Sequence, residues 1–174
     1  MRTRLSGICV LVLFTAGLWA QTGAAAGWSI YSNDAGRFSV LLPAAPQEGS
    51  STEKGVLLHS FQVVQKPRMY MVVYSDYPEA DLRLETPARL KAEMNGFLTG
   101  INGTLVSQRE FKFKRGTAEL PAVEFTAETS TPNAIYKCIV VLDSQRVYLL
   151  GAASIKGNDS TSEFERFLGS FTLR

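Results

Sequence analysis

The sequence contains one histidine, His59, and two cysteines, Cys9 and Cys138. A histidine beside a serine or cysteine could act as the general base of a nucleophilic enzyme, because the imidazole pKa lies near neutrality. No G-x-S-x-G nucleophile motif accompanies His59, which lies in a strand-like run on the face opposite Leu58. We therefore expect His59 to be a surface or edge residue and Cys138 to be a small buried hydrophobe.

Three glutamates suggest a second kind of chemistry, that of paired carboxylates. Glu124 and Glu128 are four residues apart in one predicted strand, with Glu119 shortly before them. Residues four apart on a strand share a face, and their carboxyls could approach the separations found in glycosidases. The same spacing is typical of any solvated sheet face, which is the interpretation we favour.

The sequence offers no phosphate-binding loop or calcium loop. Gly96, Gly100 and Gly103 lie at the end of a predicted helix, whereas a phosphate loop lies between a strand and the start of a helix. No D-x-D-x-D-G calcium motif is present. The sequence therefore assigns no catalytic, cofactor-binding or metal-binding residue, and we predict that the protein is not an enzyme.

Six basic residues could gather into a patch that binds an acidic protein or lipid surface, although we favour an ordinary solvated face. They are Arg109, Lys112, Lys114 and Arg115 of one predicted strand, with Lys66 and Arg68 at a predicted turn. Asn102 and Asn158 each begin an N-x-S/T sequon, and about one such match is expected by chance in this composition.

Aromatic residues could line an apolar cleft for a small ligand. The candidates are Trp28, Tyr70, Tyr74, Tyr136 and Tyr148. Large aromatic side chains are more often part of the core, which we favour here.

The first 26 residues have the three parts of a cleavable signal peptide. Arg2 and Arg4 precede an apolar run over residues 5–20, and small residues follow it. We expect cleavage near Ala26, with a second candidate cut after Ala20. The apolar run is shorter than the roughly 20 residues that span a bilayer. Cys9 lies at the start of this run, whereas a lipidated cysteine must follow it.

Removal of this segment would change the charge of the chain. Two of the 18 basic residues and none of the 16 acidic ones lie in residues 1–26, so 16 of each sign remain. A neutral domain argues against a nucleic-acid partner. Cys138 would then be the only cysteine, so no internal disulfide could form.

The remaining residues, 27–174, read as one domain with strands gathered in hairpins. Strand-like runs cover residues 27–31, 37–42, 56–65, 69–75, 105–114, 122–129, 135–142 and 147–153. Thr86 and Pro87 predict the start of a helix, with Thr86 as its N-cap. Ser160 and Glu163 have the capping-box spacing of a second helix, whose apolar face includes Phe164 and Phe167. Hairpins favour antiparallel pairing, so the predicted class is α+β.

Motifs at both ends of this domain resemble those of the PsbP-like family. Residues 36–43 form a glycine turn and an FSV-x-x-P strand, and residues 164–173 contain an F-x-x-F-x-x-SF pattern. The resemblance implies a central antiparallel sheet flanked by helices on its faces, an α-β-α sandwich. It also implies a non-enzymatic accessory or binding role, as in the extrinsic photosystem II subunit and many exported bacterial proteins.

The sequence leaves two candidate functions, and neither requires catalysis. The first is an exported, periplasmic or extracellular accessory domain that binds a protein or an envelope component. The alternative is a small-ligand-binding module with an apolar cleft. A hydrolase is disfavoured by the single histidine and the absence of a nucleophile motif.

Overall fold

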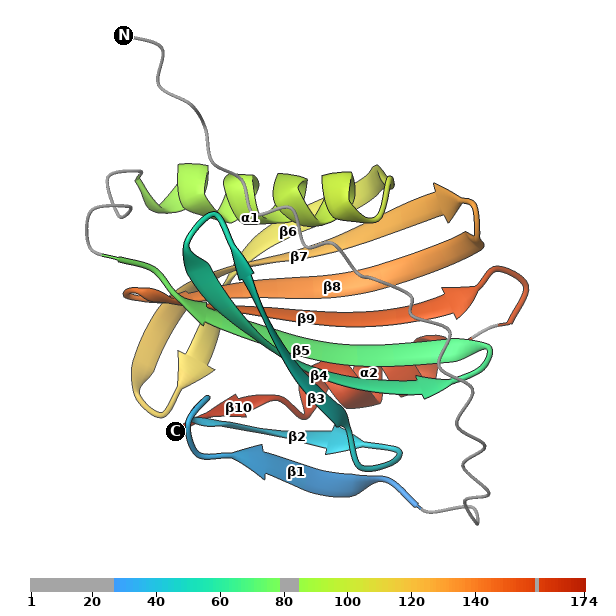
Figure 1. Cartoon of the computed structure of the whole chain (residues 1–174), viewed down its shortest axis with the longest axis horizontal. Helices are drawn as coiled ribbons and strands as arrows, with labels where there is room; N and C mark the ends of the chain where they lie inside the picture. The colour runs from blue at the N-terminus through green and yellow to red at the C-terminus, as the bar shows by residue number, and fades with distance from the viewer. Residues whose placement is uncertain (1–26, 79–84, 159) are drawn as a thin grey trace, which may run out of the picture.

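The computed structural model describes residues 27–78, 85–158 and 160–174. The predicted signal peptide, residues 1–26, lies outside these ranges, as do residues 79–84 of a polar connection. The described chain forms ten strands and two helices (Figure 1). In chain order they are β1 (Ser29–Asn33), β2 (Phe38–Leu42), β3 (Gln47–Glu53), β4 (Val56–Gln65), β5 (Arg68–Asp76), α1 (Thr86–Gly100), β6 (Thr104–Arg115), β7 (Ala118–Ser130), β8 (Asn133–Asp143), β9 (Arg146–Ile155), α2 (Thr161–Gly169) and β10 (Thr172–Leu173).

A seven-stranded antiparallel sheet, in the order β3-β4-β5-β9-β8-β7-β6, forms the centre of the molecule. The chain builds β3, β4 and β5 as one meander and then crosses to the far edge through α1. It returns as the meander β6 to β9, and β9 pairs with β5. The two predicted hairpins, β4–β5 and β8–β9, are confirmed, with Arg68 opposite Gln65 and Arg146 opposite Asp143.

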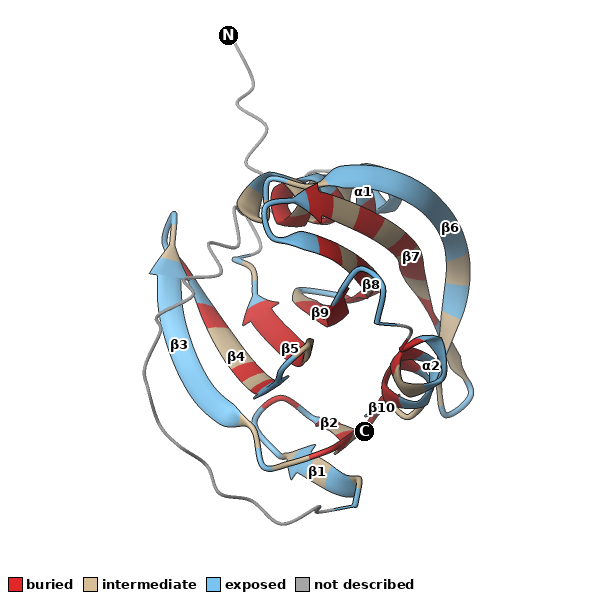
Figure 2. Cartoon of the chain, turned by 90° about the vertical axis from the view of Figure 1, so that its right-hand side faces the viewer, coloured by how far each residue is buried: buried red, intermediate tan, exposed pale blue. Residues whose placement is uncertain are grey.

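One face of this sheet is covered by a second layer made of β1, β2, β10 and α2 (Figures 1 and 2). Phe38 of β2 is fully buried at its centre. Its ring lies 5.4 Å from Phe61 of the large sheet and 5.8 Å from Phe171, which follows α2. Phe38 therefore joins β2, the large sheet and the C-terminal segment in one aromatic cluster.

A tight turn brings the first hairpin against this cluster. The Tyr148 hydroxyl donates a buried hydrogen bond of 2.8 Å to the Gly36 carbonyl. A Cβ atom at position 36 would lie 2.7 Å from the Phe38 ring and 2.8 Å from Tyr74. Only glycine fits this close approach.

The opposite face is covered by α1 alone, which packs on β7 and β8 (Figure 1). Leu90, Met94 and Phe97 of the predicted helical stripe are buried, and Leu98 and Ile101 are partly buried against the same core. The stripe is therefore confirmed.

The predicted α+β sandwich with helices on both faces is wrong. Of the described residues, 60% lie in strands and 17% in helices. A three-stranded sheet takes the place of a helical layer on one face, with only the short α2 beside it. This layer depends on β10 pairing with β2 across more than 130 residues, with Thr172 opposite Ser39, a contact that local periodicity does not reveal.

Two strands and the helix starts also differ from expectation. β10 has only two residues, and β3 consists of polar residues that are mostly exposed, so neither carries an apolar pattern. The N-cap of α1 is Glu85, so Thr86 is its first helical residue. Ser160 is the N-cap of α2 but makes no capping bond. Instead, the Arg68 Nε atom lies 2.6 Å from Ser160 Oγ and 2.6 Å from Glu163 Oε2.

We expect Phe38→Ala to lower the free energy of unfolding by about 3–5 kcal/mol, because it empties the centre of the aromatic cluster. Urea denaturation followed by circular dichroism measures this loss. Ile30→Ala on the adjacent strand is the control. Ile30 is 74% exposed, so its loss should be below about 1 kcal/mol. Equal losses in the two variants would show that the cluster does not anchor this layer.

Candidate functional site

The α1 face of the large sheet is incompletely covered. Seven strands at about 4.8 Å spacing span roughly 29 Å, whereas one helix is only about 10–12 Å wide. Hollows remain on both flanks of α1 and at its C-terminal end. The candidate functional site is therefore on this face.

Two adjoining hollows form an open cleft between α1 and the edge strand β6. One part has a volume of about 500 Å³ and an adjoining part about 350 Å³, and Pro87, Leu90 and Glu110 line both. Thr86 borders one part, and Met94 and Val123 border the other. The cleft thus has an apolar floor below a polar rim.

Basic side chains lie on the rim of this cleft. Lys91 of α1 and Lys112 of β6 line its two parts and are exposed. No ion pair joins either lysine to another residue in the described ranges. The rim carries Glu110 as well, so its local charge is one positive unit.

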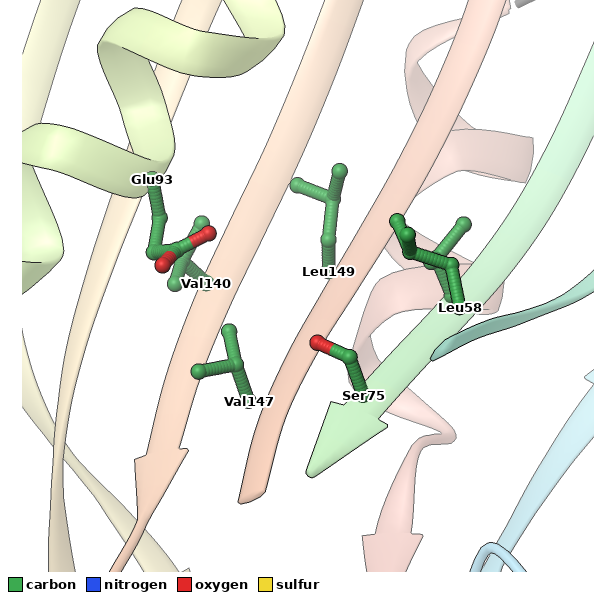
Figure 3. A pocket seen from close by; sticks show the side chains of 7 residues that line it. Leu58, Ser75, Glu93, Val140, Val147 and Leu149 are labelled. Carbon is green, nitrogen blue, oxygen red and sulfur yellow. The ribbon is translucent and has the colours of Figure 1, made fainter. Parts of the chain in front are cut away.

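A second, much smaller hollow of about 20 Å³ lies on the other flank of α1 (Figure 3). The side chains of Glu93 and Ser75 enter it from opposite sides, between Val140, Leu149 and other aliphatic residues. Its volume suffices for about one water molecule.

Glu93 is the titratable group of this hollow. The Tyr77 hydroxyl donates a 2.6 Å hydrogen bond to Glu93 Oε1. Burial raises the pKa of the Glu93 carboxyl, whereas this hydrogen bond and the nearby Arg89 charge oppose the rise. Arg89 in turn donates a hydrogen bond to the Ser144 carbonyl at 3.0 Å. The arrangement can hold a proton on Glu93.

His59 and Cys138 lie on opposite faces of the sheet, so they cannot act together. His59 is partly buried in β4, the second strand of the sheet, and its ring stacks on Tyr74 at 4.6 Å. Cys138 is fully buried in the α1-face core. Burial raises the pKa of its thiol, which disfavours the reactive thiolate. The buried position predicted for Cys138 is confirmed.

The three predicted glutamates do not form a carboxylate pair. Glu124 accepts a 2.7 Å hydrogen bond from Arg109 and lies 3.5 Å from Lys137. Glu128 pairs with Lys156 at 2.6 Å. Glu119 is exposed and lies on the opposite face, since it is an odd number of residues from the other two. The structure therefore favours the solvated face.

The predicted basic patch is not assembled. Lys66 and Arg68 lie at the β4–β5 turn, whereas the other four residues belong to β6, four strands away. Arg109 pairs with Glu124 and Arg115 with Asp143. Only Lys112 and Lys114 of β6 remain without an ion pair among the described residues.

The five aromatic candidates do not line one cleft. Tyr70, Tyr74 and Tyr148 are buried in the core below β1 and β2, and Trp28 packs against it. Tyr136 is buried in the other core, under α1. The core interpretation is therefore confirmed for all but the half-buried Trp28. Tyr136 also borders the cavity at the C-terminal end of α1.

The three glycines and the two sequon asparagines lie at or near the ends of secondary-structure elements or in turns. Gly96 is buried within α1, Gly100 ends it, and the Gly103 amide donates to the Leu98 carbonyl at 2.8 Å. Asn102 lies exposed in the following turn with a φ of 52°. Asn158 is also exposed, but its sequon includes residue 159, which lies outside the described residues.

The sequence analysis missed Glu93 and the cleft beside α1. Glu93 interrupts the apolar stripe of α1, since it lies three residues after Leu90 and just before Met94. A carboxylate within an apolar helical stripe is therefore the sequence pattern that could have identified Glu93. No sequence pattern predicts the cleft, because its two walls come together only where α1 crosses the sheet.

Within the described ranges, no three His, Cys, Asp or Glu side chains gather in a way that could hold a metal ion. Neither α1 nor α2 is long and apolar enough to cross a membrane.

We expect the Glu93 carboxyl to make stability depend on pH. A carboxyl with a raised pKa in the folded state stabilises the protein below its unfolded pKa, and this contribution is lost as pH rises through the folded pKa. Glu93→Gln cannot ionise, so its stability relative to the unmutated protein should increase as pH rises from about 3 to about 7.

Urea denaturation across this pH range measures the difference. Tyr77→Phe removes the hydrogen bond that lowers the Glu93 pKa, and it should move the loss of stability to higher pH. A difference between Glu93→Gln and the unmutated protein that stays constant with pH would contradict the assignment.

No family model matches the sequence, and no curated protein matches it. Among solved structures, a protein of unknown function from Pseudomonas aeruginosa is similar, with 10% identity, 75% of this chain and 85% of that chain covered, and a TM-score of 0.42. A protein from Bacteroides thetaiotaomicron has 14% identity, 79% and 45% coverage of this and that chain, and a TM-score of 0.39. At these TM-scores neither likeness supports a conclusion about fold or function.

Proposed function

We propose that this chain is an exported, non-enzymatic accessory domain that binds a protein, and that it does so at the cleft between α1 and β6. The single observation that carries the proposal is the combination of this cleft with a strand edge that pairs only with β7. Membership of the PsbP-like family remains part of the proposal and is supported by the terminal sequence motifs alone.

The outer edge of β6 supports an extended peptide as the occupant. A strand at the edge of a sheet presents unpaired backbone N–H and C=O groups, and an added strand can satisfy them. β6 is twelve residues long and largely exposed (Figure 2). Side chains of an added strand that point toward α1 would enter the cleft above Leu90.

The charge of the rim supports an acidic segment in the partner. Lys91 and Lys112 could each pair with a carboxylate of the bound segment, one from each wall. Lysines on an edge strand also protect it from unwanted pairing. A binding test must therefore separate a specific peptide site from simple edge protection.

We expect peptides selected from a random display library on the purified domain to share apolar side chains that alternate with acidic ones. The double variant Lys91→Glu, Lys112→Glu should bind them about tenfold or more weakly, because two attractive pairs become repulsive. Isothermal titration calorimetry with a synthetic selected peptide measures the change.

Lys66→Glu is the matched control, because Lys66 is exposed at the β4–β5 turn, away from β6. It should leave the affinity unchanged. Failure to select any peptide, or equal weakening by the control, would contradict the proposed site.

Export is part of the same proposal, and it is supported by the composition of residues 1–26. We expect the exported protein, recovered from culture medium or periplasm, to begin at Gly27, or at Gln21 if the alternative cut is used. N-terminal sequencing determines the first residue. A product that retains Met1, or one found only in the cytoplasmic fraction, would contradict export.

A further inference from the structure

The geometry points to a second binding site, which takes a small molecule rather than a peptide. We propose that the cavity at the C-terminal end of α1 binds a compact aromatic molecule of about six or seven non-hydrogen atoms. The cavity has a volume of about 160 Å³ and is bordered by α1, β5, β8 and the β7–β8 turn. It lies at the opposite end of α1 from the Pro87 part of the peptide cleft.

The walls of the cavity combine apolar side chains with polar groups in about equal measure, and Thr131 is among the lining residues. Met69 and Met71 of β5 line it with Tyr136 of β8, and all three are buried. Phe97 of α1 contacts the Tyr136 ring edge-to-face at 6.0 Å. Methionine side chains adapt to irregular shapes and make favourable contacts with aromatic rings.

The space remains empty because α1 ends above it. Gly100, the last residue of α1, contributes no side chain, and Ile101 is only partly buried at the margin. On the other side the β7–β8 turn is closed by the Thr129 hydroxyl, which donates a 2.5 Å hydrogen bond to the Pro132 carbonyl. Thr131 and Pro132 of this turn line the cavity without filling it.

The size of the cavity sets the class of ligand. An engineered cavity of about 150 Å³ lined by apolar side chains binds benzene. A cavity of 160 Å³ therefore fits a single six-membered ring, with room for one small substituent. Two fused rings would not fit without movement of the walls.

Apolar surface continues from the cavity along one row of the sheet. Met69 pairs with Val64 on one side and with Ala153 on the other, and Ala153 pairs with Tyr136. Val64 is 58% exposed. A single exposed valine is ordinary on a protein surface, so the proposal rests on the volume and the lining of the cavity.

The four methionines of the chain provide a direct test. Met69 and Met71 line the cavity, Met94 lines the α1–β6 cleft instead, and Met1 precedes the described residues. The domain is labelled with ¹³C at the methionine methyl groups and titrated with benzene and with phenol. We expect the Met69 and Met71 signals to shift in a saturable way while the Met94 signal does not.

Two variants and a larger probe sharpen the result. Ile101→Trp should fill the cavity and weaken phenol binding at least tenfold, whereas Ile30→Trp, the same exchange at an exposed position of β1, should leave it unchanged. The probe 1-naphthol, with two fused rings, should not shift the Met69 and Met71 signals. If Ile101→Trp does not fold, the titrations of the unmutated protein with benzene, phenol and 1-naphthol test the proposal.

Several outcomes would overturn the proposal. They are the absence of saturable shifts with benzene and phenol, shifts of Met94 instead of Met69 and Met71, and equal binding by folded Ile101→Trp. Peptide binding at the α1–β6 cleft is measured separately, so a negative result at one site does not contradict the proposal for the other site.

Discussion

The central strands of the large sheet are apolar on both faces, and each face must therefore be covered. In β9, every residue from Val147 to Ser154 is buried, and successive side chains alternate between the two cores. A strand with this pattern is stable only between two layers. The rest of the structure follows from how the chain supplies these layers.

The two layers are unequal. One face is sealed by β1, β2, β10 and α2, which meet at Phe38, and the Tyr148 hydroxyl holds the first hairpin against the sheet. The other face is covered by α1 alone. The peptide cleft, the hollow of Glu93 and the small cavity are all consequences of this shortfall in width, so the features open to binding lie around one helix.

The same sheet separates the two residues whose types are typical of nucleophilic catalysis. His59 faces the sealed layer and Cys138 faces α1. Glu124 and Glu128 have basic partners, so their charges are compensated locally. The one carboxyl whose pKa burial raises, Glu93, has a tyrosine hydroxyl as its hydrogen-bond partner and a hollow with space for a single water molecule. The proposal of a binding domain therefore rests on the cleft beside α1 and not on these residues.

The sequence by itself determined the elements whose apolar residues recur at a fixed spacing. The eight predicted strands and both helices are present, as are the hairpins β4–β5 and β8–β9 and the burial of Cys138, because alternation and helical spacing are local properties of the chain.

Tertiary structure decided the remaining features of the fold and of the candidate site. The polar β3 and the short β10 form only because a neighbouring strand supplies their hydrogen bonds. The pairing of β10 with β2 replaced the expected helical layer with strands. The crossing of α1 placed Leu90 and Lys91 opposite β6, and the end of α1 left the cavity beside Tyr136. Such features depend on which elements meet and how far each one extends, and residue spacing within an element holds no information about either.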